Sequence, residues 1–208
     1  DHTLRGKFLE THPLIIIGAD FNKEALEVTK RNLINNKINN FLIEADISNP
    51  EKFASTLKRK HNIELDTMIN VRSFLDHNRI YNKPNTNREN NNIIGSFSQR
   101  GVLIKPSDVM QNLVEHFSKW KPFCKKHGVL ILELHTVESN KAQENIGDTL
   151  TSAYDATHGY SDQYIISLQD FLNAAEKAGF KIDSNSSYKF PNNEIPTVSI
   201  NYFICPSS

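Results

Sequence analysis

The sequence predicts an α/β fold in which a mostly parallel sheet is covered by helices on both faces. Short apolar runs alternate with segments of helical periodicity, starting with the run at 14–18 and the helix pattern at 21–33. This alternation requires right-handed crossovers between parallel strands. Two further strand patterns, at 180–190 and 197–205, are close enough in sequence to pair antiparallel at a sheet edge. The predicted architecture is therefore a doubly wound sheet that ends in an antiparallel strand pair.

The size and charge of the chain limit the number of domains and the kinds of ligand that it can have. Its 208 residues suffice for one α/β domain, which we expect to span 1–208. The 24 basic and 24 acidic residues cancel, so no overall field attracts nucleic acid or an anionic membrane. The sequence has no metal-type cysteine spacing, no signal-peptide layout and no apolar run of roughly 20 residues. We therefore expect a cytoplasmic protein whose ligand is selected by local side chains.

The first half of the chain contains two similar strand–helix units. The run at 14–18 is typical of a strand buried on both faces of a parallel sheet. Asn22 is a suitable N-cap for the helix at 21–33, which an asparagine-rich run ends. The second unit has a strand at 41–43 and a helix at 48–60 that begins with a Ser-Asn-Pro signal. Two strand–helix units therefore follow one another along the chain.

The second half continues the pattern with longer connections. A third strand is predicted at 65–71, followed by a polar surface loop at 82–92. Large apolar residues recur at helical spacing in a helix at 106–126, so its stripe is expected to be core. The run at 129–134 is the strongest strand pattern in the chain, and 167–179 reads as a capped helix.

Polar side chains gather where these predicted strands end. They are Asp20, Asp46, Asn70, Glu133 and His135. Ligands of parallel sheets bind at this edge, and a carboxylate at Asp20 can accept two hydrogen bonds from a ribose diol. The same acid would also be stabilised by the dipole of the following helix. Asp46 repeats the position, where it could accept from an adenine amino group while Ile47 packs on the ring. The two acids together favour a nucleoside ligand.

Several motifs occur in a familiar order: GADFN, EADISNP, LDTMINVRSFLDHNR, HGVLILEL, KAGF and a terminal strand pair. This order resembles the class I S-adenosylmethionine-dependent methyltransferases, which have a Rossmann-like fold. The resemblance implies S-adenosylmethionine as cofactor, with the ribose held by the acid after the second family strand and adenine contacted by the acid after the third. The cofactor-binding residues that it implies are Asp20, Phe21, Asp46, Ile47 and Asn70.

One family motif is missing from the sequence. The first family strand and its glycine-rich loop should precede residue 14, where Gly6 is the only glycine. We therefore expect the chain to lack the first strand of the family fold and to be the C-terminal part of a longer protein. The alternative is a non-catalytic, methyltransferase-like remnant that serves docking or structure. The C-terminal antiparallel pair argues against a third class, the nicotinamide dehydrogenases.

A narrower resemblance rests on RGKFLETHPLIIIGADFN, VRSFLDHNR and YDATHGYSDQY. These stretches are similar to methyltransferase domains of polyketide-synthase assembly lines, which methylate an acyl chain on a carrier protein. The resemblance implies methyl transfer to a carbon or oxygen of a small or carrier-tethered acyl substrate. Some such domains use a mononuclear metal, which here implies Fe(II) or Mn(II) bound by His158 and Gln163. An ordinary polar lid loop, with His158 capping a helix, explains the same residues.

Three residues are candidates to act on the methyl acceptor: His135, His77 and Arg72. His135 follows Glu133 by two residues, so both side chains share a face if the strand persists, and an imidazole pKa of about 6.5 suits a base. A histidine bonded to a backbone carbonyl is the alternative. His77 follows the third strand and could complete a polar substrate wall with Arg72, which could instead pair with Asp76 on the surface. The sequence does not rank the three.

Overall fold

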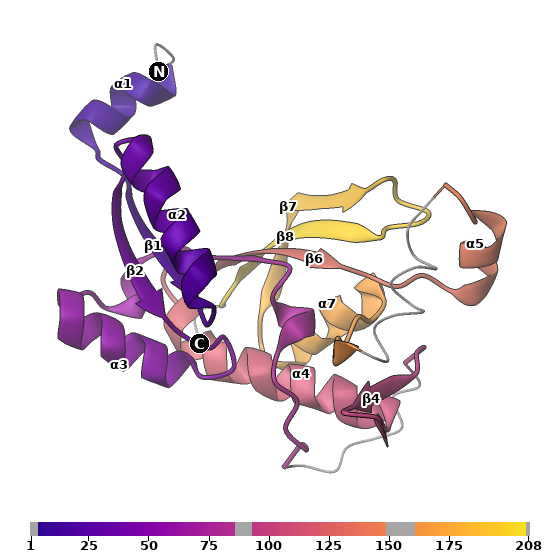
Figure 1. Ribbon diagram of the computed structural model, residues 1–208. Coiled ribbons are helices and arrows are strands. Elements are labelled where there is room, and N and C mark those ends of the chain that lie inside the picture. The colour runs from indigo at the N-terminus through magenta and orange to yellow at the C-terminus, as the bar shows by residue number, and fades with distance from the viewer. Residues whose placement is uncertain (1–3, 86–92, 149–160, 207–208) are drawn as a thin grey trace. The chain divides into compact units, whose positions relative to one another are not determined.

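The structure is a computed structural model that describes residues 4–85, 93–148 and 161–206 (Figure 1). Its internal contacts group the chain into two compact units. Unit 1 is Asp1–Ile63 and unit 2 is Glu64–Ser208. The single domain expected from the chain length stays a prediction.

Unit 1 consists of a two-stranded parallel sheet and three helices. Its elements are α1 (Leu4–Thr11), β1 (Ile15–Asp20), α2 (Lys23–Asn35), β2 (Asn39–Glu44) and α3 (Pro50–His61). As predicted, Asn22 caps α2, because its side chain accepts from the N–H groups of Glu24 and Ala25. The N-cap of α3 is Asn49, one residue after the predicted start of that helix. The two strand–helix units expected from the sequence are therefore confirmed.

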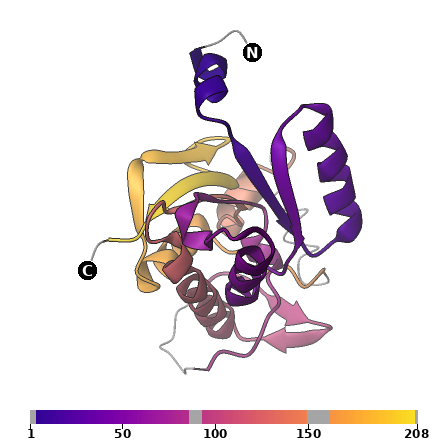
Figure 2. The same cartoon turned by 90° about the vertical axis from the view of Figure 1, so that its left-hand side faces the viewer.

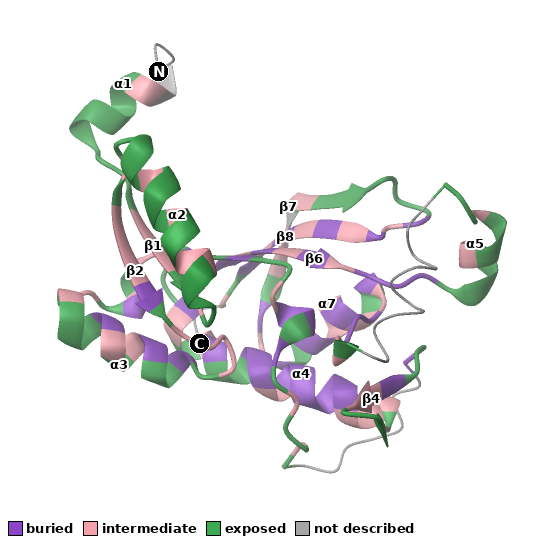
Figure 3. Cartoon of the chain, in the orientation of Figure 1, coloured by how far each residue is buried: buried purple, intermediate pink, exposed green. Residues whose placement is uncertain are grey.

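The prediction that the first strand is buried on both faces is wrong. No residue of β1 or α2, both fully within the described part of the chain, is buried, and Ile15 is 52% exposed (Figure 3). In the described residues β1 pairs with β2 alone. Both faces of β1 therefore carry exposed or half-buried side chains, unlike the strands of a parallel sheet that helices cover on both sides.

Unit 2 contains a four-stranded mixed sheet in the order β3-β6-β8-β7. Its strands are β3 (Asn70–Ser73), β6 (Val129–Leu134), β7 (Lys181–Phe190) and β8 (Val198–Ile204). β3 is parallel to β6, whereas β8 is antiparallel to both of its neighbours. The C-terminal antiparallel pair is therefore confirmed, and the described sheets mix parallel and antiparallel strands rather than being mostly parallel.

A small hairpin in unit 2 was not expected from the sequence. β4 (Phe97–Gln99) and β5 (Val102–Ile104) pair antiparallel and lie apart from the four-stranded sheet (Figure 2). Each strand has three residues, too few to give a periodic pattern. The turn uses left-handed backbone at Arg100 and Gly101. Of the polar loop predicted before this hairpin, 86–92 lies outside the described residues.

Two helices and the sheet form the core of unit 2. They are α4 (Pro106–Trp120) and α7 (Leu168–Lys177), while α5 (Ser139–Glu144) is short and has no buried residue. The apolar stripe of α4 is buried as predicted, and the ring of Phe117 lies 5.3 Å from that of Phe171 on α7. After Trp120 the chain continues as a 3₁₀ turn, η3 (Lys121–Cys124), so α4 ends earlier than predicted. Pro122 has no N–H with which to extend the α-helix.

The third strand is displaced from its predicted position at 65–71. The chain first forms a 3₁₀ turn, η1 (Leu65–Thr67), and the strand starts only at Asn70. The backbone N–H and the hydroxyl of Thr67 both donate to the carbonyl of Glu64, which favours the turn over an extended chain. Asn70 therefore begins β3 instead of ending it. No helix in the described residues has the length and apolar character needed to cross a bilayer.

Candidate functional site

The two acids of unit 1 lie at the same end of its sheet. Asp20 is the last residue of β1, and its backbone carbonyl accepts from the N–H of Ala45, directly before Asp46 (2.9 Å). Each carboxylate is half-buried and holds a local turn through Oδ1, which accepts from Asn22 and Ser48 respectively at 2.8 Å. The turns fix both acids at the carboxyl ends of parallel strands, the position that suits a nucleoside.

Two apolar side chains accompany these acids. Phe21, beside Asp20, is 73% exposed, and Ile47, beside Asp46, is half-buried. An exposed aromatic ring next to a fixed carboxylate can cover a base or a sugar face. The residues of this edge therefore fit the nucleoside part of S-adenosylmethionine in their chemistry.

Asn70 does not lie where the sequence placed it. It is buried at the amino end of β3, and its amide donates to the backbone carbonyl of Phe123 (3.1 Å). In the parallel pair it lies opposite Val129, the first residue of β6. The expected position at the carboxyl end of the strand is corrected, because that end is formed by Ser73.

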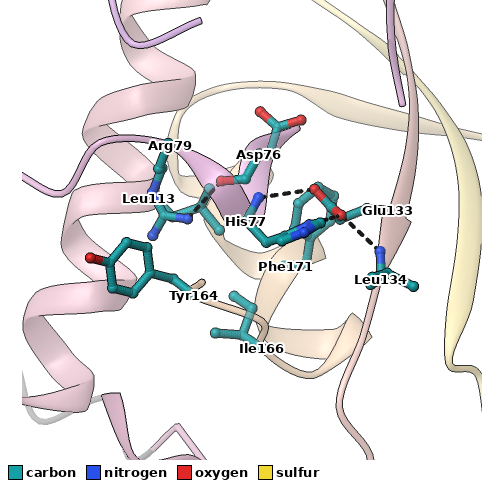
Figure 4. A pocket seen from close by; sticks show the side chains of 9 residues that line it. All are labelled: Asp76, His77, Arg79, Leu113, Glu133, Leu134, Tyr164, Ile166 and Phe171. Carbon is teal, nitrogen blue, oxygen red and sulfur yellow. Dashed lines mark hydrogen bonds and ion pairs between the residues drawn. The ribbon is translucent and has the colours of Figure 1, made fainter. Parts of the chain in front are cut away.

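Unit 2 contains a small pocket that begins where β6 ends (Figure 4). Its walls combine charged, aromatic and aliphatic side chains. They are Asp76, His77, Arg79, Leu113, Glu133, Leu134, Tyr164, Ile166 and Phe171. The first three belong to or follow a 3₁₀ turn, η2 (Asp76–Asn78), shortly after β3. Of the three acceptor-site candidates, only His77 lines this pocket.

His77 and Glu133 form a buried pair in the pocket. The Nδ1 atom of His77 lies 2.5 Å from Oε1 of Glu133, and the His77 backbone N–H donates to Oε2 (3.1 Å). The N–H of Leu134 also donates to Oε1 (2.8 Å), so three donors hold the carboxylate. The other ring nitrogen of His77 lies 3.0 Å from the amide nitrogen of Asn78.

This arrangement selects a tautomer of His77. The Glu133 carboxylate can only accept a hydrogen bond, so Nδ1 of His77 carries the proton. The Asn78 amide nitrogen can only donate, so Nε2 carries the lone pair. The tautomer is assigned from these two partners. In this tautomer Nε2 carries the lone pair of the ring, to which the Asn78 amide donates, and a carboxylate on the other nitrogen would stabilise an imidazolium. The pair has the geometry of a general base and its orienting group.

A second buried cluster lies beside the first. Oδ1 of Asp76 accepts from Nη1 of Arg72 (2.6 Å) and lies 2.9 Å from Nε2 of His116. Arg72 also stacks on Trp120, with its guanidinium carbon 4.2 Å from the ring centre. The predicted Arg72–Asp76 pair is therefore present, but it is buried and not on the surface. Arg72 does not line the pocket among the residues described.

Burial and charge shift the pKa values in this cluster. Burial alone would raise the pKa of Asp76, but the charge of Arg72 and the hydrogen bond from His116 outweigh it and hold this pKa well below its usual range. Burial lowers the pKa of His116 to about 4, although Asp76 opposes the change. At neutral pH the cluster therefore contains a cation, an anion and a neutral imidazole.

His135 lies in the core and does not line the pocket. It follows β6 directly, has no exposed surface, and its ring packs edge-on against Phe171. Nε2 lies 2.7 Å from the hydroxyl of Ser199, and burial lowers the pKa of His135 to about 4. Besides the Ser199 hydroxyl, a backbone hydrogen bond at Ile166 acts on His135 and opposes this lowering of its pKa, as the predicted alternative of a carbonyl-bonded histidine has it. Glu133 and His135 are both buried, but β6 ends at Leu134, and Glu133 alone of the two lines the pocket among the residues described.

The predicted metal ligands are only partly within the structure. His158 lies outside the described residues, and the side-chain oxygen of Gln163 accepts from the hydroxyl of Ser161 (3.2 Å). Across 4–85, 93–148 and 161–206, no group of three or more histidine, cysteine or acidic side chains could hold a metal ion. The proposed metal site therefore stays a prediction.

Comparison with known families now adds to this geometry. The family model described as the AprA MT2-like domain matches residues 1–201. The chain belongs to this family. The AprA MT2-like domains are methyltransferases related to those of polyketide synthases, for which S-adenosylmethionine is the usual cofactor. No curated protein sequence matches the chain. The resemblance to methyltransferase domains related to those of polyketide synthases is therefore confirmed. The buried His77–Glu133 pair belongs to a methyltransferase-like domain.

Proposed function

We propose that this AprA MT2-like domain transfers a methyl group from S-adenosylmethionine to a carbon or oxygen of a small or carrier-tethered acyl acceptor. The observation that carries the proposal is the pair of His77 and Glu133, buried at the carboxyl end of β6. A buried carboxylate is costly to remove from water, so its hydrogen bond with an imidazole is weak support for a purely stabilising role. A base with its orienting group explains the pair better than a non-catalytic remnant does.

The carboxylates of unit 1 are the proposed donor-binding groups. Asp20 would accept from the ribose hydroxyls and Asp46 from the adenine amino group, with Phe21 and Ile47 covering the apolar faces. S-adenosylmethionine, when bound, supplies an electrophilic methyl group on a sulfonium. The parallel pairs β1–β2 and β3–β6 support the further proposal that the domain has a Rossmann-like, doubly wound sheet.

The residues of unit 2 would prepare the acceptor. His77 takes a proton on Nε2, and Glu133 stabilises the resulting imidazolium through Nδ1–H. Leu113, Ile166 and Phe171 add apolar surface to the lining of the same pocket, and charge interactions are stronger beside apolar surface than in water. Methyl transfer needs alignment of donor and acceptor more than covalent help from the protein.

The proposal is tested by methyl transfer with a labelled donor. The chain is incubated with S-adenosylmethionine and either acetoacetyl N-acetylcysteamine or an acyl-carrier thioester, and products are followed by mass spectrometry. We expect one added methyl group, and a loss of about 10²–10⁴-fold in rate for His77→Gln, because a positioned base contributes that much. Donor binding, measured by calorimetry, should be unchanged in this variant. Donor binding without methyl transfer to either class of thioester would contradict the proposal.

A further inference from the structure

The β4–β5 hairpin presents apolar side chains to solvent (Figure 3). On β5, Val102 is 69% exposed and Leu103 is 84% exposed, the highest exposed fraction among the large apolar residues described. Phe97 on β4 is buried and anchors the hairpin, whereas Val102 and Leu103 add little buried area to the fold. Neighbouring apolar side chains at an exposed edge are typical of a surface that contacts another molecule.

Two cations flank these apolar side chains. Arg100 lies in the turn of the hairpin, Lys105 directly follows β5, and both residues are exposed. The segment 94–107 contains no acidic residue, although basic and acidic residues are equal in number over the whole chain. The hairpin is therefore a local positive surface with an apolar centre. A protein partner that matches it presents acidic side chains around an apolar contact.

The hairpin is fastened to segments that form a wall of the pocket. The backbone N–H of Arg100 donates to the carboxylate of Asp162 (2.8 Å), two residues before the pocket-lining Tyr164. The side-chain amide of Gln99 donates to the backbone carbonyl of Tyr81 (3.1 Å), and the rings of Tyr81 and Tyr164 are 5.8 Å apart. Two residues of chain span at most about 7 Å, so the tip of the hairpin lies close to this wall.

We propose that the β4–β5 hairpin is the docking surface for an acidic carrier domain that brings its acyl group to the pocket. This inference rests on the proposed methyltransferase function and identifies where the partner binds. Val102 and Leu103 form the apolar centre of the contact, and the cations at either end of β5 pair with acidic side chains of the carrier domain. The phosphopantetheine arm then extends from the hairpin along the wall that contains Tyr164.

The charge of the hairpin selects this occupant over a second copy of the chain. In a symmetric dimer the same patch of each copy faces the other, so Arg100 and Lys105 would meet the same two cations of the second copy. Like charges placed opposite each other oppose association. An acidic partner is attracted by the same side chains, and this attraction decreases as salt increases.

The test measures binding without a methyl donor, so it does not depend on methyl transfer. A phosphopantetheinylated carrier domain of a polyketide synthase is titrated into the fluorescently labelled chain, and anisotropy gives the Kd. We expect saturable binding that weakens at higher salt. Leu103→Asp, which removes an apolar contact and adds a negative charge, should raise the Kd by at least about tenfold. Lys105→Glu should raise it by about tenfold.

Tyr188→Asp and Lys189→Glu are the matched controls. They make the same kinds of change at exposed residues of β7, the edge strand of the four-stranded sheet. Both should leave the Kd unchanged. Equal effects in the hairpin and control variants would overturn the inference, as would a wild-type chain that does not bind the carrier domain. Self-association of the chain that Leu103→Asp abolishes would also overturn it, in favour of a second copy.

Methyl transfer separates this inference from the proposed function. Leu103→Asp should lower kcat/KM by about tenfold for an acyl group on the carrier domain and leave it unchanged for the same acyl group on N-acetylcysteamine. Equal losses with both substrates would overturn the docking role. Carrier binding that depends on Leu103, without methyl transfer to either substrate, would support the docking surface and contradict the proposed function instead.

Discussion

The carboxylates of unit 1 and unit 2 occupy opposite environments. Asp20 and Asp46 are half-buried, and each accepts from a backbone N–H two residues later in its own segment. Asp76 and Glu133 are almost fully buried, and each accepts from a side chain on a different element. The first pair is held by local turns, and the second by tertiary packing.

This difference matches the roles proposed for the two regions. A half-exposed carboxylate keeps oxygens available for hydroxyl or amino donors and loses little solvation while it waits for a ligand. A buried carboxylate needs hydrogen-bonding or charged partners, and its field acts strongly on neighbouring groups because little water screens it. Unit 1 is therefore suited to binding a polar ligand, and unit 2 to holding charges in place for chemistry.

The largest difference that we expect between the buried and the half-buried carboxylates is in the free energy of unfolding when one of them is removed. Asp76→Ala leaves Arg72 as a buried, unpaired cation, so we expect a loss of about 3–5 kcal/mol in the free energy of unfolding. The matched variant Asp20→Ala removes a half-exposed carboxylate and should change it by about 0.5 kcal/mol or less. Urea denaturation of both variants measures the difference. Equal losses would mean that the two environments do not differ in energy as described.

The next largest effect that we expect is a dependence of stability on pH that comes from buried histidines. Burial lowers the folded-state pKa of His116 from 6.5 to about 4. Between these values the unfolded chain binds more protons than the folded one, so this contribution to stability is present above pH 6.5 and is lost as pH falls toward 4. The shift corresponds to a loss on the order of 3 kcal/mol. His135, whose pKa is also lowered to about 4, acts in the same direction.

Urea denaturation at several pH values tests this expectation. His116→Gln should reduce the dependence of stability on pH over this window, because one of the two protonation sites is gone. An exposed histidine provides the control: His12→Gln should leave the dependence of stability on pH unchanged, because the side chain at this position stays in contact with water. A wild-type stability that stays constant over the window would contradict the burial of both imidazoles.

Local chemistry made several elements of both units predictable from the sequence. The N-caps Asn22 and Ser167, the strand at 129–134 and the strand-end acid Asp20 all depend on neighbours a few residues away. The exception is β3, where Thr67 closes a turn against Glu64 and moves Asn70 to the other end of the strand. Element boundaries are where such local competition decides the outcome.

The pocket of unit 2 could be predicted only in part. His77 and Glu133 were both noticed at predicted strand ends, but their contact joins residues 56 positions apart, and no local pattern specifies it. The sequence predicts no role for Arg79, because its partners Asn112 and Val109 come from α4, about 30 residues further along the chain. One signal was available: Glu133 interrupts an apolar strand, and a buried acid requires a partner.

The smallest effect expected concerns donor binding at the edge of unit 1. Asp20→Asn keeps the size of the side chain and an oxygen for the turn with Asn22, but loses the charge that would accept from the ribose hydroxyls. We expect the Kd for S-adenosylmethionine to rise by about tenfold, equivalent to about 1.4 kcal/mol, in calorimetric titration. Glu44→Gln, which changes an exposed acid of the same sheet paired with Lys23, is the matched control and should leave the Kd unchanged. If both variants bind the donor as the wild type does, the carboxylate at the end of β1 holds only its own turn. The proposal that unit 1 binds the donor through Asp20 would then be contradicted.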